Sequence, residues 1–268
     1  MNRTFKTDCI GYALFAILLL VVIPWAVSFD GFALNTYARY LALGMVAMAL
    51  ALSWGYAGIL NLGQAATFGV GAYAMAMHLK LKGSAGNPGG LPDFMGWNNV
   101  EALPWFWVPF HSLGFTLIAG LAVPAVVAGL MGMFMFRARI TGVFVAIITL
   151  AFLVALQLVF IEEQRFTNGQ NGLTGLAPLS IGGWSVDTYS LSFYYLVAGC
   201  LVAALCLGTL VVRSKVGLIL RAIREDAMRV RYFGYDVARY ETFVFALSAA
   251  IAGWAGMLYA LVLEFASP

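Results

Sequence analysis

The chain has 268 residues, of which 62% are hydrophobic and only 10% charged, and its mean hydropathy is +0.89. Soluble domains contain about 45–50% apolar and about 25% charged residues, so this composition excludes a water-soluble globular protein. The net charge of +3 is small and the basic residues cluster between Arg213 and Arg239, which argues against nucleic acid as a partner.

Apolar windows of about 20 residues, each long enough to cross about 30 Å of hydrocarbon, recur along the chain. The first follows Arg3 and Lys6 and could mimic a signal peptide, but it lacks a small-residue cleavage site, so we interpret it as a retained helix. The predicted fold class is an all-α, polytopic transmembrane protein that forms one domain over residues 1–268. Its seven predicted spans are residues 10–29, 33–54, 62–80, 109–135, 142–161, 192–212 and 242–264.

Orientation follows from the positive-inside rule, which assigns the basic segment 213–239 to the cytoplasm. The N-terminus is then cytoplasmic too, and the long loops 82–108 and 162–191 face outward. Four tryptophans lie in or near these outer loops, where indole rings settle at the lipid headgroups: Trp97, Trp105, Trp107 and Trp184. Lys80 and Lys82 fall outside against the rule. They indicate that the glycine-rich segment before them does not cross the membrane as a simple helix.

Residues 55–73, GYAGILNLGQAATFGVGAY, have a composition that is not typical of a membrane span. Five glycines interrupt the apolar sequence, and Asn61, Gln64 and Thr67 supply uncharged polar groups. Irregular backbone at membrane depth is tolerated only where protein or a water-filled cavity satisfies its amides. Two interpretations remain open: a broken helix that lines a solute path, or close helix packing through Gly63, Thr67 and Gly71.

Residues 213–240 are too charged to span a membrane, yet Val216, Ile219, Leu220 and Ile223 recur at helical spacing. We predict an amphipathic helix at about 215–235 on the cytoplasmic surface, ended by Gly234 in the left-handed conformation. A lipid-headgroup anchor is one interpretation. A coupling helix that docks into another protein is the other, and the acidic pair Glu225 and Asp226 favours it because an anchor for anionic lipid gains nothing from acids.

The outer loop 167–175, TNGQNGLTG, is rich in turn formers and amide side chains, including Asn168 and Asn171. It either contacts a docking protein or an uncharged solute, or forms a plain turn. His78 and His111, like Cys9, Cys200 and Cys206, lack the spacing of a metal site or disulfide framework, so we predict packing or interfacial roles and no metal. No cofactor is predicted either.

The spans carry almost no ionisable residue at membrane depth, unlike those of a typical proton-driven or ion-driven carrier. The phosphate-binding pattern GxxxxGK[ST] is absent from the sequence as well, so the chain does not bind ATP in that way. Energy for transport would have to come from a partner.

Four blocks in this order resemble the permease subunits of branched-chain amino acid type ABC importers. They are GYAGILNLGQAATFGVGAY at 55–73, RITGVFVAIITLA at 139–151, NGQNGLTG at 168–175 and the long block at 214–260. Within that family, the loop GNPGGLPDFMGWNNVEALPWFW at 86–107 is similar to the urea-transporting branch, as are RITGVF and RYFGY. Relatives continue beyond the position of Pro268, so the resemblance implies a C-terminally shortened chain.

The resemblance implies a permease of the bacterial inner membrane that imports a small polar solute, urea or a short amide, with branched-chain amino acids as the alternative. Its implied partners are a second permease subunit, two cytoplasmic ATP-binding subunits and a periplasmic solute-binding protein. Residues 215–235 match the helix that docks into the ATPase in this family. The implied coupling residues are Gly217, Arg221, Arg224, Glu225, Ala227, Gly234 and Tyr235.

An uncharged polar path would suit a small neutral solute, because weak hydrogen bonds bind it without trapping it. The candidate path residues are Asn61, Gln64, Thr67, Thr149 and Gln157. Three other functions remain open. A channel or secondary carrier would transport without an ATPase, a membrane enzyme would need clustered catalytic groups that the sequence does not show, and a structural subunit would not transport even in a complete assembly.

Overall fold

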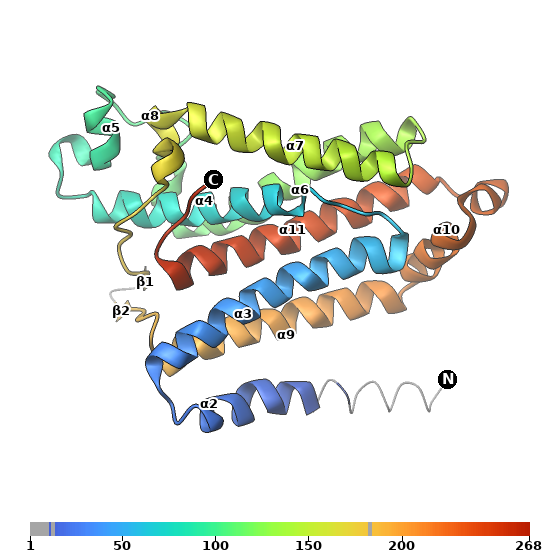
Figure 1. The fold of residues 1–268 in the computed structure, drawn as a ribbon, viewed down its shortest axis with the longest axis horizontal. Helices are drawn as coiled ribbons and strands as arrows, with labels where there is room; N and C mark the ends of the chain where they lie inside the picture. Colours follow the sequence, from blue (N-terminus) through green and yellow to red (C-terminus); the bar gives the residue numbers. More distant parts are fainter. Residues whose placement is uncertain (1–10, 12–13, 182–183) are drawn as a thin grey trace.

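The computed structural model describes residue 11, residues 14–181 and residues 184–268. Most of them are helical, and the long helices run roughly along one axis (Figure 1). The long helices are α3 (Gly31–Leu50), α4 (Gln64–Gly83), α6 (Leu113–Arg137), α7 (Val143–Glu162), α9 (Leu191–Arg213), α10 (Lys215–Tyr232) and α11 (Val237–Leu263). The shorter ones are η1 (Leu18–Val22), α2 (Ile23–Ala26), η2 (Ala51–Tyr56), η3 (Pro88–Gly90), α5 (Asp93–Trp97), η4 (Val108–His111), α8 (Gln164–Thr167) and η5 (Gly169–Asn171).

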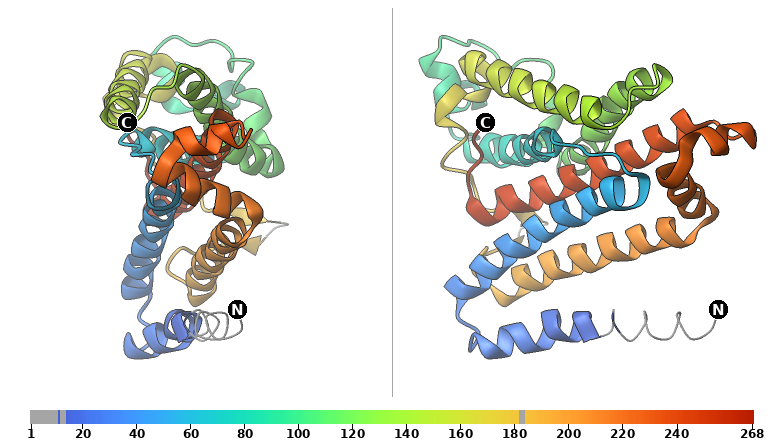
Figure 2. Two further views of the ribbon diagram at one scale, coloured as in Figure 1. Left: turned by 90° about the vertical axis from the view of Figure 1, so that its right-hand side faces the viewer. Right: turned by 45° about the vertical axis from the view of Figure 1, so that its right-hand side comes forward.

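The two ends of the bundle differ in sequence. We call one the basic end, defined by α10 and by the turn between α6 and α7 with Arg137 and Arg139. The other is the loop end, defined by residues 84–112 and 163–190 (Figures 1 and 2). A two-stranded antiparallel sheet at the loop end pairs β1 (Ser180–Ile181) with β2 (Trp184–Ser185), a small exception to the predicted all-α fold. The sequence predicts the same division, with the basic segments at one end and the long loops 82–108 and 162–191 at the other.

Within the described residues, five helices are long and apolar enough to cross a membrane. They are Gly31–Tyr56, Leu113–Arg137, Val143–Glu162, Leu191–Arg213 and Val237–Leu263. These correspond to five of the seven predicted spans and confirm a polytopic helical membrane protein. The predicted span 10–29 begins outside the described residues, as do Arg3, Lys6 and Cys9, and its described part is a shorter apolar helix, Leu14–Ala26. The predicted span 62–80 corresponds to α4, which is long enough but less hydrophobic than these five helices.

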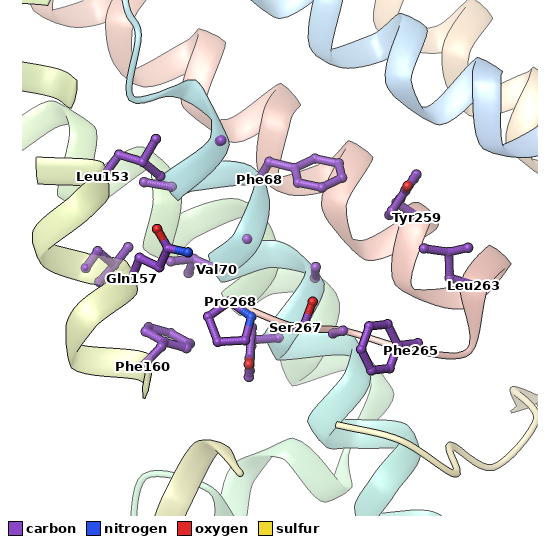
Figure 3. A pocket seen from close by; sticks show the side chains of 17 residues that line it. Phe68, Val70, Leu153, Gln157, Phe160, Tyr259, Leu263, Phe265, Ser267 and Pro268 are labelled. Atoms are coloured by element: carbon purple, nitrogen blue, oxygen red, sulfur yellow. The ribbon is translucent and has the colours of Figure 1, made fainter. Parts of the chain in front are cut away.

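Side chains at the loop end connect helices that are distant in sequence. The Asn35 amide donates to the backbone oxygens of Thr188 and Val262, 3.2 Å from each, and so joins α3 to α11. Lys80 donates to the Thr174 oxygen at 2.9 Å, which explains why a basic residue is accommodated there. Past α11 the chain turns back across α4 (Figure 3). Ala266 in this segment forms a β-bridge with Leu173.

The predicted positions of the aromatic and titratable loop residues are only partly correct. Trp97 and Trp105 are more than 80% exposed, as expected at an interface, but Trp107 is buried and only 9% exposed. His78 is fully buried, and its Nδ1 atom lies 2.6 Å from the Phe110 oxygen. Among the described residues no group of three potential metal ligands occurs.

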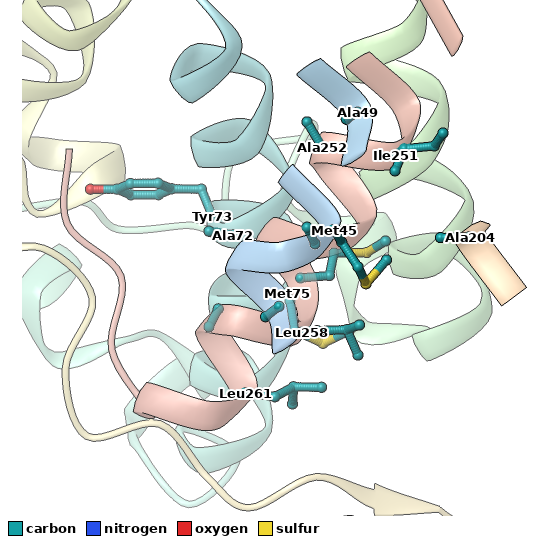
Figure 4. Packing of buried hydrophobic residues seen from close by; sticks show 14 of the residues in the cluster. Met45, Ala49, Ala72, Tyr73, Met75, Ala204, Ile251, Ala252, Leu258 and Leu261 are labelled. Atoms are coloured by element: carbon teal, nitrogen blue, oxygen red, sulfur yellow. The ribbon is translucent and has the colours of Figure 1, made fainter. Parts of the chain in front are cut away.

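Helix α11 is the centre of the bundle and packs against α3, α4 and α6 (Figure 4). Glycines make this contact close. A Cβ atom at Gly71 would lie 2.0 Å from the Gly253 oxygen, and one at Gly256 would lie 2.0 Å from the Phe68 oxygen. Since real Cβ atoms do not approach so closely, these positions of α4 and α11 accept only glycine. Close packing through Gly71 is therefore confirmed.

Candidate functional site

The chain between α3 and α4 is a break in helical structure inside the bundle. Helix α3 continues through the π-helix η2 to Tyr56, and Gly58 then adopts a left-handed conformation with φ of +74°. Residues 58–61 are non-helical, and the chain returns from the basic end to the middle of the bundle, where α4 begins at Gln64 (Figure 1). The predicted break within 55–73 is therefore confirmed together with close packing, and its role in a solute path stays a prediction.

A buried network of uncharged groups secures the start of α4. The Asn61 amide donates to Gln64 Oε1 at 2.6 Å, and its own oxygen accepts from the Gly63 N–H at 3.0 Å. Gln64 Nε2 donates to the backbone oxygen and the hydroxyl of Ser248 at 3.0 and 3.1 Å. The Ser248 hydroxyl donates to the Ala49 oxygen at 2.7 Å. This network connects α3, α4 and α11 across the break.

Helix α7 closes the break from the other side through Thr149. Its hydroxyl accepts from the Leu62 N–H at 3.2 Å, and a Cβ atom at Gly63 would lie 2.3 Å from the Thr149 backbone oxygen. Thr67 is also buried, with its hydroxyl donating to the Gln64 oxygen at 2.8 Å. A void of only about 10 Å³ remains between these residues. The described residues at the break are therefore too closely packed to leave an open path between them.

Four of the five candidate path residues lie together at this break: Asn61, Gln64, Thr67 and Thr149. Gln157 does not join them. It is exposed and lines a separate cavity of about 460 Å³ between α4, α7, α11 and residues 265–268 (Figure 3). Most of that cavity's lining is apolar. Tyr73 also lines it, and its buried hydroxyl has no hydrogen-bond partner among the described residues. Sequence reasoning missed Ser248, whose only signal is a hydroxyl within an apolar helix.

In the loop 167–175, Asn168 has a left-handed backbone with φ of 64°, and its amide donates to the Gly172 oxygen at 2.5 Å. Asn171 is exposed at the end of η5. Asn168 thus has a role in turn geometry, whereas Asn171 is accessible at the loop end.

Helix α10 folds against the basic end with the predicted apolar face. Leu220 and Ile223 are buried, while Val216 and Ile219 are half-buried. Arg224 donates to the Gly55 backbone oxygen, and Arg221 donates to the Val212 oxygen at 3.0 Å. Arg221 also lies 5.9 Å from the centre of the Tyr56 ring. Two of the predicted coupling residues, Arg221 and Arg224, therefore contact the C-terminal end of α9 and the segment just before the break.

The amphipathic helix predicted at about 215–235 is observed as α10, which ends at Tyr232. The sequence did not predict its interruption at Asp226, where φ is −157° and ψ is 94°. The cause is capping: Asp226 Oδ1 accepts from the N–H groups of Met228 and Arg229 at 3.0 and 3.1 Å and starts a second short helix. Gly234 has φ of +86°, which confirms the left-handed end, and Tyr235 is exposed beyond it.

A cavity of about 280 Å³ at the basic end lies beside the contact between α10 and the start of the break. Arg224, Glu225 and Ala227 line it, together with Gly58 and Glu241. Glu241 is only 6% exposed, and sequence reasoning missed it because it lies one residue before the predicted span.

Gly217 fixes how closely α10 approaches α9. A Cβ atom there would lie 2.1 Å from the Val212 oxygen, so we expect Gly217→Ala to push the start of α10 away from α9. The expected result is faster trypsin cleavage at the arginines of α10 with little change in total expression. Leu218→Ala is the control because that side chain is 68% exposed, and equal cleavage of both variants would contradict the prediction.

Comparison with known proteins agrees with this architecture. Residues 32–268 match the family model described as the branched-chain amino acid transport system permease component. The chain belongs to this family. It is 29% identical to the high-affinity branched-chain amino acid transport system permease protein LivM of Salmonella typhimurium over 94% of its length, and 29% identical to LivM of Escherichia coli over 95%. No solved structure matches the chain.

The chain spans 57% and 58% of the length of these two curated relatives, somewhat more than half. Family membership makes it a permease component of this type of transport system.

Proposed function

We propose that the chain is a permease subunit of an ATP-driven importer in a bacterial inner membrane and forms part of the path for a small polar solute. The basic end faces the cytoplasm in this proposal, following the positive-inside rule. Two ATP-binding subunits contact α10, a second permease subunit completes the path, and a periplasmic binding protein delivers solute to the loop end.

The observation that carries the proposal is the mid-bundle break held by uncharged amide and hydroxyl groups. The start of the break, at the basic end, contacts α10 directly, because Arg224 donates to the Gly55 oxygen and packs against Gly58. A movement of α10 driven by ATP would therefore pull on the segment that closes the path. The ATP-bound state must differ in its contacts with α10 for this coupling to occur.

Urea or a short amide is the first candidate solute. The groups at the break are amides and hydroxyls, which can exchange their present hydrogen bonds for weak, replaceable bonds to a neutral solute. The similarity of residues 86–107 to the urea-transporting branch supports this choice. Branched-chain amino acids are the second candidate, favoured by the largely apolar 460 Å³ cavity and by both relatives, which are named as branched-chain amino acid permeases.

The deciding experiment is ATP hydrolysis in liposomes by the full-length permease with its partner subunits, titrated with urea or with leucine. Stimulation by urea supports the first solute and stimulation by leucine the second. Solute uptake by the purified permease alone would identify a channel or carrier instead. Failure of the complete assembly to transport any solute would favour a structural subunit.

Arg224→Glu is expected to abolish the stimulation of ATP hydrolysis, because a carboxylate cannot donate to the Gly55 oxygen and reverses the charge of the α10 surface. Basal hydrolysis and assembly should persist. Lys215→Glu is the matched control, since Lys215 is exposed in the first turn of α10, where a carboxylate is favourable. Full stimulation in the Arg224 variant would contradict coupling through this contact.

A further inference from the structure

A second cavity at the basic end has the properties of a lipid site. It measures about 500 Å³ and lies between η2, α9 and α10. Met48, Leu52 and Leu205 line one part of it, and Arg213 and Arg221 line another. Leu205 and Arg213 are eight residues apart on α9, which corresponds to about 12 Å along a helix at 1.5 Å per residue. The cavity thus passes from an apolar wall to a basic rim.

At the basic rim of this cavity, two contacts hold the guanidinium group of Arg221 in place. Arg221 donates to the Val212 oxygen at 3.0 Å and lies 5.9 Å from the centre of the Tyr56 ring, so it is fixed from two sides. That contact uses one of its five N–H donors, and the planar arrangement of the others suits a phosphate group. Arg213 lies at the same rim and adds a second positive charge.

We propose that this cavity binds one anionic phospholipid, with its phosphate at Arg221 and Arg213 and its upper acyl chain along Met48, Leu52 and Leu205. Basic pockets between membrane helices on the cytoplasmic side are suited to anionic headgroups. A free phosphate would leave the apolar wall uncovered, and a neutral lipid would not use the two arginines. The proposal rests on the proposed orientation but not on the proposed solute.

Because Arg221 belongs to α10, the bound lipid joins α10 to α9 and η2 at the membrane surface. It would restrain the helix that the proposed function assigns to coupling. The lipid therefore belongs to the moving part of the transporter, in contrast to a passive annular lipid.

The test is native mass spectrometry of the full-length permease, purified with its partner subunits and titrated with dioleoyl phosphatidylglycerol or dioleoyl phosphatidylcholine. One phosphatidylglycerol should bind clearly more tightly than phosphatidylcholine. Arg221→Gln should weaken phosphatidylglycerol about fivefold, since one basic residue near an anionic headgroup contributes about that factor. Gly208→Leu should block it by filling the apolar part, where the nearest atom to a new Cβ is the Met48 sulfur at 3.8 Å.

Two control variants separate the site from general effects. Arg229→Gln removes a charge from α10 that is 82% exposed and paired with Asp226, outside the cavity. Gly199→Leu adds the same side chain to α9 where nothing lies within 4 Å. Both should bind phosphatidylglycerol like the native chain.

Several outcomes would overturn the proposal. Equal affinity for the two lipids would remove the role of the arginines, and unchanged binding in both Arg221→Gln and Gly208→Leu would place the lipid elsewhere. Displacement of phosphatidylglycerol by inorganic phosphate would identify a free-anion site. Loss of binding only after the second permease subunit joins would identify a protein segment as the occupant. Lipid binding is read by mass, so it can fail while solute-stimulated ATP hydrolysis succeeds, and the reverse.

Discussion

A single added methyl group at Gly71 is expected to destabilise the bundle by about 3 kcal/mol, at the upper end of the usual cost of overpacking. The new Cβ atom of Gly71→Ala would lie 2.0 Å from the Gly253 oxygen and 2.6 Å from its carbonyl carbon. Both are backbone atoms, so relief requires α4 and α11 to separate. The thermal unfolding midpoint in detergent should fall by roughly 6–12 °C, given about 2–4 °C per kcal/mol for a chain of this size class.

Gly69→Ala is the matched control, because it lies on the same helix and nothing is within 4 Å of its added Cβ atom. Alanine is the better helix former by about 1 kcal/mol, so this variant should be as stable as the native chain or slightly more stable. An equal fall in the unfolding midpoint for the two variants would show that α4 and α11 are not in close contact.

Gln64→Leu is expected to cost about 2–3 kcal/mol and to impair transport, because it leaves the buried Asn61 amide and the Ser248 hydroxyl with fewer partners. The side chains are similar in size, so the loss reports hydrogen bonding and not a cavity. Thermal unfolding measures the stability, and solute-stimulated ATP hydrolysis at a temperature well below unfolding measures the function.

Gln157→Leu makes the same substitution at an exposed position on α7 and is expected to leave the unfolding midpoint unchanged. A native midpoint for Gln64→Leu would mean that the network at the break does not stabilise the fold. Normal stimulation by solute despite lower stability would remove the break from the transport path.

Hydrophobic length was enough to predict the five apolar spans, since each covers the bilayer with residues whose type depends little on the tertiary contacts. Helix α4 was harder to predict. Its glycines and its terminal Lys80 and Lys82 indicated an unusual segment, but where the helix restarts depends on bonds from Gln64 to α11, which are 184 residues away in sequence.

The sequence predicted only part of the candidate site. Polar residues in a glycine-rich stretch pointed to Asn61 and Gln64, and the structure brings Thr149 to them. Gln157 was chosen for its chemistry alone and lies elsewhere, because it is about 12 Å further along α7 than Thr149 and lines the 460 Å³ cavity. The interruption at Asp226 had a local signal, because Asp is a preferred N-cap residue.

The central position of α11 has a consequence for how the protein is made. Helices α3, α4 and α6 are synthesised and inserted before α11, yet their small and polar contact surfaces are complementary to it. The hydrogen bonds from Asn35 to Val262 and from Gln64 to Ser248 can form only once α11 is present. During translation the earlier helices can cross the bilayer one by one, and α4 can pack on α6, but the contacts of α3, α4 and α6 with α11 form only after residue 263 leaves the ribosome. Insertion is therefore sequential, whereas the central packing of the bundle forms late.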